Sequence, residues 1–336
     1  MKTGFVNSLI LILIAGVFSI KAQDDRAIGV IKVDTRLVIV PVIVRDRNGR
    51  YVPNLSAEDF TILQDGSSQT IEFFGATEEP LTIVLLIDTS ASTEPVLDEI
   101  KEAAKSFVKL LQPRDQAMIV AFDHDIHVLS PLTSEHDRLN RAIKSAEIAE
   151  FLGTQLRDYL FRVIGQTLRP LSGRKAIILL TDGKDTTSQI SIPDLIYGVQ
   201  EADSLIYSVM FRTGESGIQH IILPRPGSVL PNGRRPFDPP PMLRLPLPKT
   251  IQNRKAQLFL QKLSDITGGR FYSSGDANLK KIFTSIVEEL RFQYRLGFYP
   301  PDEAIDKTLF EIKVKVSRPG VVVRSRSSYR VQNRNN

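Results

Sequence analysis

A repeated alternation of strand-like and helix-like segments between residues 80 and 292 is the strongest constraint on how this chain can fold. The apolar run at 82–87 has the pattern of a central parallel strand that is covered on both faces. The alternation predicts an α/β fold with a doubly wound, mostly parallel sheet and right-handed crossovers. Further strand-like runs lie at 117–122, 175–181, 204–211 and 269–272, and helical segments lie at 96–111, 135–146, 156–168, 193–202, 255–266 and 279–290.

The segments on either side of this region, 27–79 and 293–333, have the composition of β-structure. Asn48-Gly49 and Asp65-Gly66 are turn signals, and apolar residues alternate with polar ones along 309–316. Because about fifty residues make only a marginal β-unit, we expect the two ends to pair into one small β-sandwich. The central region would then be an insertion between them; two independent flaps are the alternative.

Residues 1–22 have the pattern of a secretory signal peptide. Lys2 supplies a positive charge, the stretch 9–18 is apolar, and Ala22 is a small residue at the cleavage point. An uncleaved N-terminal anchor is the alternative, because the apolar stretch is near the lower limit for a membrane span. We expect the rest of the chain to be exported to the periplasm, the cell surface or the medium, with no transmembrane segment after cleavage.

Composition excludes several classes of function. The chain has 336 residues, enough for about two domains. It contains no cysteine, which rules out disulfides, thiolate zinc sites, iron–sulfur clusters and a cysteine nucleophile. Its 43 basic and 38 acidic residues give a net charge of +5, which is too mild to indicate nucleic-acid binding.

A proline-rich segment interrupts the central alternation. Residues 213–250 contain nine prolines, a density that no helix or central strand tolerates. We therefore expect an irregular insertion that leaves the carboxyl end of the strand at 204–211. It is interpreted either as a surface insertion or as a loop that contacts a partner.

Oxygen-bearing side chains follow two strands of the central region. Asp88, Ser90 and Ser92 come directly after the strand at 82–87, and Asp182 follows the strand at 175–181. A further hydroxyl, that of Thr154, precedes a helix. Loops that follow parallel strands gather at one edge of a doubly wound sheet, so these five side chains are expected to converge there. Carboxylates and hydroxyls are hard donors that suit a hard divalent cation.

With these residues the chain resembles a von Willebrand factor type A (VWA) domain, and the five match that family's metal-ion-dependent adhesion site (MIDAS) one for one. The resemblance implies a Rossmann-like fold and a Mg²⁺ (or Mn²⁺) ion whose shell is completed by an acidic residue of a partner protein. It leaves open which aspartate touches the ion directly. The outer segments resemble those of an acidobacterial-type family of exported VWA proteins. One departure from the family is Leu152, where a second glycine is common.

The implied function is an exported, metal-dependent protein-binding (adhesion) module that is not an enzyme. The main alternative is a structural or assembly component of the cell envelope that does not use the metal. A phosphotransferase with Asp88 as acceptor is a weaker alternative, because Ser90 stands where such enzymes generally place a second aspartate. The D-x-S-x-S pattern can also be only a helix cap and turn.

Two other charged groups are interpreted as solvated surface. The run 123–127, which carries two aspartates and two histidines, is expected to be the turn of a short hairpin. The basic positions Arg324, Arg326 and Arg330 are expected on the exposed face of one edge strand at 321–331, where charge deters edge-to-edge pairing.

Overall fold

The computed structural model describes residues 37–75, 79–150, 153–211, 249–275, 278–301 and 309–330. The predicted signal peptide at 1–22, residues 213–248 of the predicted insertion, and Leu152 lie outside the described residues. Within the described ranges, no helix combines the length and the apolar character needed to cross a membrane.

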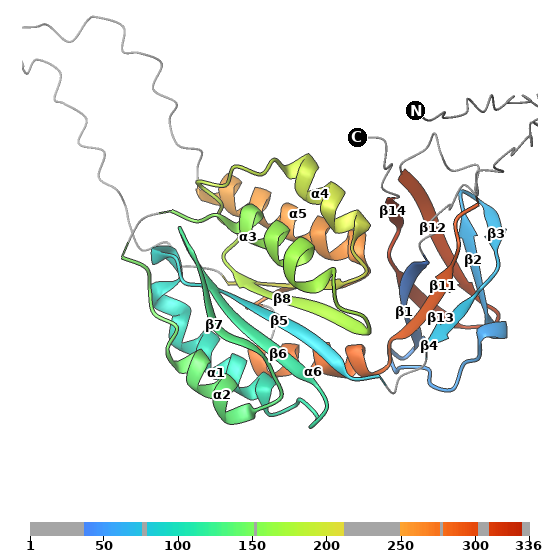
Figure 1. Cartoon of the computed structure of the whole chain (residues 1–336), viewed down its shortest axis with the longest axis horizontal. Coiled ribbons are helices and arrows are strands. Elements are labelled where there is room, and N and C mark those ends of the chain that lie inside the picture. The colour runs from blue at the N-terminus through green and yellow to red at the C-terminus, as the bar shows by residue number, and fades with distance from the viewer. Residues whose placement is uncertain are drawn as a thin grey trace, which may run out of the picture. The chain divides into compact units, whose positions relative to one another are not determined.

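The central region forms a six-stranded sheet in the order β10-β9-β8-β5-β6-β7 (Figure 1). All neighbouring pairs are parallel except β6 and β7, which form an antiparallel hairpin. The chain runs from β5 to β6 on one side and returns to β8 on the other, so β5 lies at the topological switch point. The strands are β5 (Leu81–Asp88), β6 (Gln116–Phe122), β7 (Ile126–Thr133), β8 (Arg174–Thr181), β9 (Leu205–Met210) and β10 (Phe271–Ser273).

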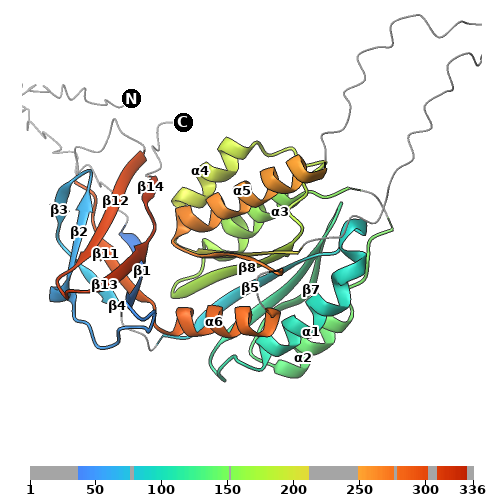
Figure 2. The ribbon, with the colours of Figure 1, turned by 180° about the vertical axis from the view of Figure 1, so that it is seen from behind.

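Helices cover both faces of this sheet, which confirms the predicted doubly wound α/β class (Figure 2). The first face carries α1 (Leu97–Val108), α2 (His136–Lys144) and α6 (Leu279–Arg291). The second carries α3 (Leu156–Arg162), α4 (Ile192–Glu201) and α5 (Lys249–Thr267).

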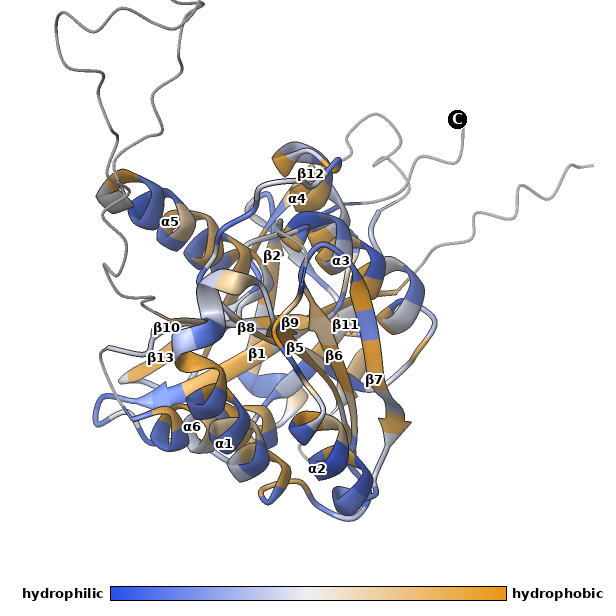
Figure 3. Cartoon of the chain, turned by 90° about the vertical axis from the view of Figure 1, so that its left-hand side faces the viewer, coloured by the Kyte–Doolittle hydropathy of each residue, from blue (hydrophilic) through white to orange (hydrophobic). Residues whose placement is uncertain are grey.

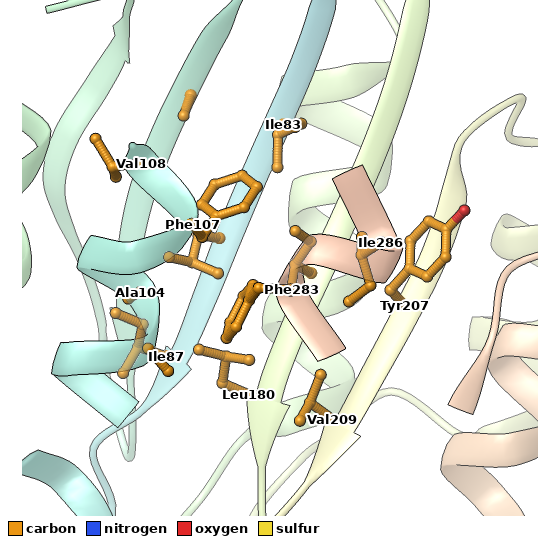
Figure 4. Close-up of a cluster of buried hydrophobic side chains, with 14 of the residues drawn as sticks. Ile83, Ile87, Ala104, Phe107, Val108, Leu180, Tyr207, Val209, Phe283 and Ile286 are labelled. Carbon is orange, nitrogen blue, oxygen red and sulfur yellow. The ribbon is translucent and has the colours of Figure 1, made fainter. Parts of the chain in front are cut away.

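Because both faces are covered, the central strands carry apolar side chains at nearly every position, while the helices are apolar on one side only (Figure 3). In the first layer, Phe107 of α1 packs against Phe283 of α6 with ring centroids 5.7 Å apart. Figure 4 shows both rings above Ile87 and Leu180 of the sheet. This packing holds α1 and α6 together on the first face of the sheet.

The predicted helices are confirmed with two differences at their ends. The segment expected as one helix at 156–168 is α3 followed by a π-helical stretch, η3 (Val163–Leu168). The helix expected from 255 begins at Lys249, so the last two positions of the predicted insertion, 249 and 250, are helical. A 3-10 turn, η2 (Ala91–Val96), precedes α1.

The flanking segments pair with each other, as predicted. One four-stranded sheet has the order β13-β1-β11-β4 and the other has the order β14-β12-β2-β3. Apolar side chains of both sheets form one shared core, around Val42, Tyr294 and Phe310. The strands are β1 (Val38–Asp46), β2 (Phe60–Gln64), β3 (Ser67–Gln69), β4 (Phe73–Gly75), β11 (Tyr294–Phe298), β12 (Leu309–Val316), β13 (Val321–Ser325) and β14 (Ser328–Arg330), with a 3-10 turn, η1 (Ala57–Asp59).

The prediction of one solvated strand at 321–331 is wrong. The chain changes sheets here: β13 pairs with β1, whereas β14 pairs with β12. Arg326 lies at the crossing, is only 4% exposed, and donates to the carbonyl oxygens of Gln200 and Ala202. The guanidinium of Arg324 pairs with Glu289 of α6. These arginines therefore bind internal acceptors and do not form an exposed face.

Candidate metal site

Asp88 is the last residue of β5, and its side chain is fully buried. One carboxylate oxygen, Oδ1, accepts the backbone N–H of Ser90 at 3.0 Å and the Ser90 hydroxyl at 2.6 Å. The other, Oδ2, accepts the hydroxyl of Thr181 at 2.5 Å. Asp88 is therefore held between the loop that follows β5 and the end of the neighbouring strand β8.

The loop after β5 presents the two predicted serines. Their hydroxyl oxygens lie 3.2 Å apart; Ser90 is buried and Ser92 is half-buried. Ser90 is the N-cap residue that precedes η2, but its side chain makes no capping hydrogen bond and donates to Asp88 instead. The buried hydroxyl of Thr93 lies 2.9 Å from the carbonyl oxygen of Asp88 and 2.7 Å from that of Ser90. Ser90 thus does not act as a simple helix cap, and Thr93 fixes the loop.

Asp182 comes directly after β8 and is 2% exposed. Since Ile87 of β5 lies opposite Leu180 of β8 in a parallel register, the ends of the two strands place Asp88 and Asp182 at the same edge. Asp182 Oδ1 accepts the backbone N–H of Lys184 at 3.0 Å, and Oδ2 pairs with the Lys184 ammonium. Burial, together with the negative charge of Asp182, raises the pKa of Asp88 to about 6.

Thr154 reaches the same edge through the loop that follows Asp182. It is buried, its N–H donates to the hydroxyl of Thr186 at 2.9 Å, and its carbonyl oxygen accepts the N–H of Thr186 at 3.0 Å. Asp185 extends this link, because its carboxylate accepts the N–H and the guanidinium of Arg157 at the start of α3. The structure therefore brings together segments 88–92, 154 and 182, which the sequence separates by almost a hundred positions.

Asp123 was missed by the sequence analysis. The hairpin turn predicted at 123–127 is present, with Asp125 and His127 exposed, but Asp123 is buried. Its carboxylate accepts the hydroxyl of Thr89 at 2.9 Å, and its carbonyl oxygen accepts the N–H of Gln155 at 2.9 Å. Asp123 thus ties the loop after β5 to the segment that carries Thr154. Asp123 comes directly after β6, a third strand that ends at the same edge of the sheet, and this position was the sequence signal that could have identified it.

These donors fit a hard divalent cation. The two carboxylates supply negative charge, and the hydroxyls of Ser90, Ser92 and Thr154 are neutral oxygen ligands of the kind that Mg²⁺ and Mn²⁺ accept. Over the part of the chain that the structure describes, no group of three or more His, Asp or Glu side chains is arranged to hold a metal ion. A cation at this edge would therefore depend on hydroxyl ligands beside Asp88 and Asp182.

Comparison with known families gives one match: the model described as "von Willebrand factor type A domain" matches residues 83–184. This range runs from β5 to the loop after β8 and includes all five predicted metal ligands. A search of the curated proteins finds no match to the sequence. The resemblance to an acidobacterial-type exported family, and the metal site itself, stay predictions.

Solved structures with a similar chain fold include the following three proteins. BatB from Bacteroides thetaiotaomicron is 16% identical, covers 62% of this chain and 97% of its own, and has a TM-score of 0.43. Proximal thread matrix protein 1 from the mussel byssus, solved with a zinc-occupied MIDAS motif, is 16% identical, with coverages of 66% and 48% and a TM-score of 0.46. A von Willebrand factor type A protein from Catenulispora acidiphila is 13% identical, with coverages of 88% and 72% and a TM-score of 0.44.

Proposed function

We propose that the von Willebrand factor type A domain of this chain, identified by the match over residues 83–184, binds a partner protein through a divalent cation. Asp88, Ser90, Ser92, Thr154 and Asp182 would hold Mg²⁺ (or Mn²⁺) at the carboxyl edge of the central sheet. When bound, the ion supplies an electrophilic position that accepts a carboxylate oxygen from an acidic residue of the partner.

The observation that carries this proposal is a pair of buried carboxylates at the end of two adjacent parallel strands. Asp88 is fully buried and Asp182 almost so, and burying two like charges together is unfavourable unless a cation compensates them. The raised pKa of Asp88 expresses this cost. The hydroxyls of Ser90 and Ser92 lie in the loop that follows Asp88, and that of Thr154 comes from a third segment; carboxylates with hydroxyls are the donor set that a hard cation prefers.

The residues of the proposed site have different roles. Asp88 and Asp182 supply charge, while Ser90, Ser92 and Thr154 supply neutral oxygens that leave the bound ion electrophilic. Thr181 orients the side chain of Asp88, while Thr93 and Asp123 fix the loop that follows β5, through the hydrogen bonds described above. The half-buried position of Ser92 places the outer side of the site towards solvent, from where a partner approaches.

Binding is favoured over catalysis at this site. A phosphoryl acceptor must be reached by its substrate, but the carboxylate of Asp88 is fully buried and both of its oxygens accept hydrogen bonds. Ser90, at the position of the second aspartate of such enzymes, donates to Asp88 and carries no carboxylate. We therefore propose that the protein is not an enzyme. With the predicted leader at 1–22, we further propose that it acts outside the cytoplasm.

The metal proposal is tested by thermal unfolding with and without Mg²⁺. Mg²⁺ at 100 times its dissociation constant should stabilise the protein by about 2.7 kcal/mol. The Asp88→Asn and Asp88→Ala variants should fold and lose this response, whereas Asp265→Asn, which changes an exposed aspartate of α5, should keep it. A wild-type melting temperature unchanged by Mg²⁺ and Mn²⁺, or an unchanged shift in both Asp88 variants, would contradict the site.

The partner proposal is tested by capture from an envelope extract with Mg²⁺ or with EDTA. A partner should be retained by the wild type with Mg²⁺ and lost with EDTA or in the Asp88→Ala variant. Binding that survives both treatments would instead favour the structural or assembly component that does not use the metal.

A further inference from the structure

Lys184 occupies both oxygens of the carboxylate of Asp182. Its backbone N–H donates to Oδ1 at 3.0 Å, and its side-chain ammonium forms an ion pair with Oδ2. The lysine side chain is 33% exposed, whereas that of Asp182 is 2% exposed. A solvent-accessible cation that belongs to the chain therefore lies against one of the two buried carboxylates of the proposed metal site.

The backbone holds Lys184 in this position. Gly183, between the two residues, has φ +77°, which turns the chain back so that residue 184 faces the carboxylate two positions earlier. The turn is packed against α5, since a Cβ added at Gly183 would lie 2.9 Å from Cβ of Ala256. On the other side, Asp185 accepts the backbone N–H of Arg157 at 2.9 Å. Because the backbone is fixed at both ends of the turn, a displacement of the ammonium from Asp182 has to come from a movement of the lysine side chain.

We propose that Lys184 is a tethered competitor of the metal ion, an inference that rests on the proposed function of this site. Its ammonium neutralises Asp182 when no divalent cation is bound. A cation that takes Oδ2, directly or through water, must displace the ammonium. Lys184 therefore lowers the affinity of the site for the cation and stabilises the metal-free protein.

The same lysine favours the partner's carboxylate once the cation is bound. Two aspartates and one ammonium give the metal-free site one net negative charge, so a divalent ion leaves it with one net positive charge. Without Lys184 the loaded site would be neutral. Because the displaced ammonium stays at the exposed rim, its charge attracts an incoming acidic side chain. Lys184 thus weakens the binding of the cation and strengthens the subsequent binding of the partner's carboxylate.

The test is calorimetric titration of the full chain with Mg²⁺ alone, with thermal unfolding in EDTA as a second readout. Lys184→Met removes the charge and keeps most of the side-chain length, Lys184→Arg keeps the charge, and Lys313→Met removes an exposed charge from β12 as a matched control. We expect Lys184→Met to bind Mg²⁺ about tenfold more tightly. Tenfold is the lower end of the change in metal affinity that follows substitution of a group in contact with metal ligands. It should also melt at a lower temperature in EDTA, because Asp182 loses its counter-ion.

Lys184→Arg and Lys313→Met should bind Mg²⁺ with an affinity within about twofold of the wild type, because surface substitutions usually have effects of this small size. If the wild type binds Mg²⁺ and Lys184→Met binds it no more tightly, the competitor role is overturned and the proposed function stands. If Lys184→Arg gains as much affinity as Lys184→Met, the competitor role is likewise overturned, because the charge is then irrelevant. If no form of the protein binds Mg²⁺ or Mn²⁺, the proposed function falls and this inference falls with it.

Discussion

At the scale of single residues, buried carboxylates in this protein differ in how their charge is compensated. Asp88 is fully buried and faces a second carboxylate, and these two effects outweigh the hydroxyl and N–H groups that it accepts, so its pKa is raised. Asp115 is equally buried, but it accepts the N–H groups of Leu81 and Gln112 and both ends of the Arg291 guanidinium. The first arrangement sets two carboxylates against the single ammonium of Lys184 and keeps one net negative charge, whereas the second matches one carboxylate with one guanidinium.

Asp115 therefore predicts an acid-dependent contribution to stability. Burial alone would raise its pKa, but the Arg291 guanidinium and the two N–H donors outweigh burial and lower it. A lowered pKa gives stability that is complete above the ordinary aspartate value of about 3.9 and is lost as the pH falls through the folded value. Asp115→Asn should cost about 2 kcal/mol at pH 7, and its difference from the wild type should shrink towards pH 3. Urea unfolding at several pH values measures this; Asp265→Asn is the control, and a pH-independent difference would contradict it.

At the scale of elements, the site is made by turns that follow strands. Strand β5 ends at an aspartate, Asp88, and the loops after β6 and β8 begin with Asp123 and Asp182; the fold places all three at one edge of the sheet. Hydrogen bonds between the loops, and not within them, set their relative positions. A change in the turn at Gly183 should therefore alter the positions of the proposed metal ligands.

Gly183→Ala should destabilise the protein more than Gly173→Ala. Both glycines have positive φ, +77° and +92°, so alanine at either costs about 1 kcal/mol of backbone strain. A Cβ at Gly183 would also meet Ala256 at 2.9 Å and Leu260 at 3.0 Å, whereas nothing lies within 4 Å at Gly173. We expect an additional loss of about 1–3 kcal/mol from overpacking and a weaker Mg²⁺ response in Gly183→Ala alone. Equal losses of stability and an intact response would contradict this.

At the scale of the whole molecule, Glu289 of α6 joins the central sheet to the flanking strands. Its carboxylate is fully buried, and it accepts the hydroxyl of Tyr207 of β9 at 2.8 Å. It also pairs with Arg45 of β1 at 2.8 Å and with Arg324 of β13. Since one charge holds two guanidinium groups from two different strands, Glu289 should couple the unfolding of the two regions.

Glu289→Gln should lower stability by about 3 kcal/mol, because Arg45, Arg324 and also Arg270, at 3.6 Å, lose their counter-ion. The described α-helices all belong to the central region, whereas Tyr294 and Tyr329 lie in the core of the flanking sheets. The helical band of the far-UV circular dichroism thus follows the central region, whereas the near-UV tyrosine signal includes the flanking core together with central residues such as Tyr207. We expect coincident transitions in the wild type and separate ones in Glu289→Gln. The control is Glu288→Gln, on the exposed side of α6; coincident, unshifted transitions in Glu289→Gln would refute the coupling.

Much of the fold and the residues of the candidate site could be predicted from the sequence. Periodicity located the central helices and strands to within a few residues, because a sheet covered on both faces needs continuous apolar strands. The spacing Asp88, Ser90, Ser92 marked the site because its residues are close in sequence. Asp123, Lys184 and Arg326 were assigned to surface or passed over, because their partners lie far along the chain or across a turn.

The sequence by itself determined the α/β class, the β-composition of the two ends and the oxygen donors at the strand ends, since each depends on local pattern or residue type. The tertiary structure decided that the two ends pair with each other and are not two independent flaps. Only the tertiary structure decided which charges are compensated internally. Arg326 became buried and Arg324 half-buried because the last strand changes sheets, and the pKa of Asp88 is raised because its side chain is buried and Asp182 lies beside it. Burial and distance set the energy of a charge, and both depend on contacts between residues that are remote in the chain.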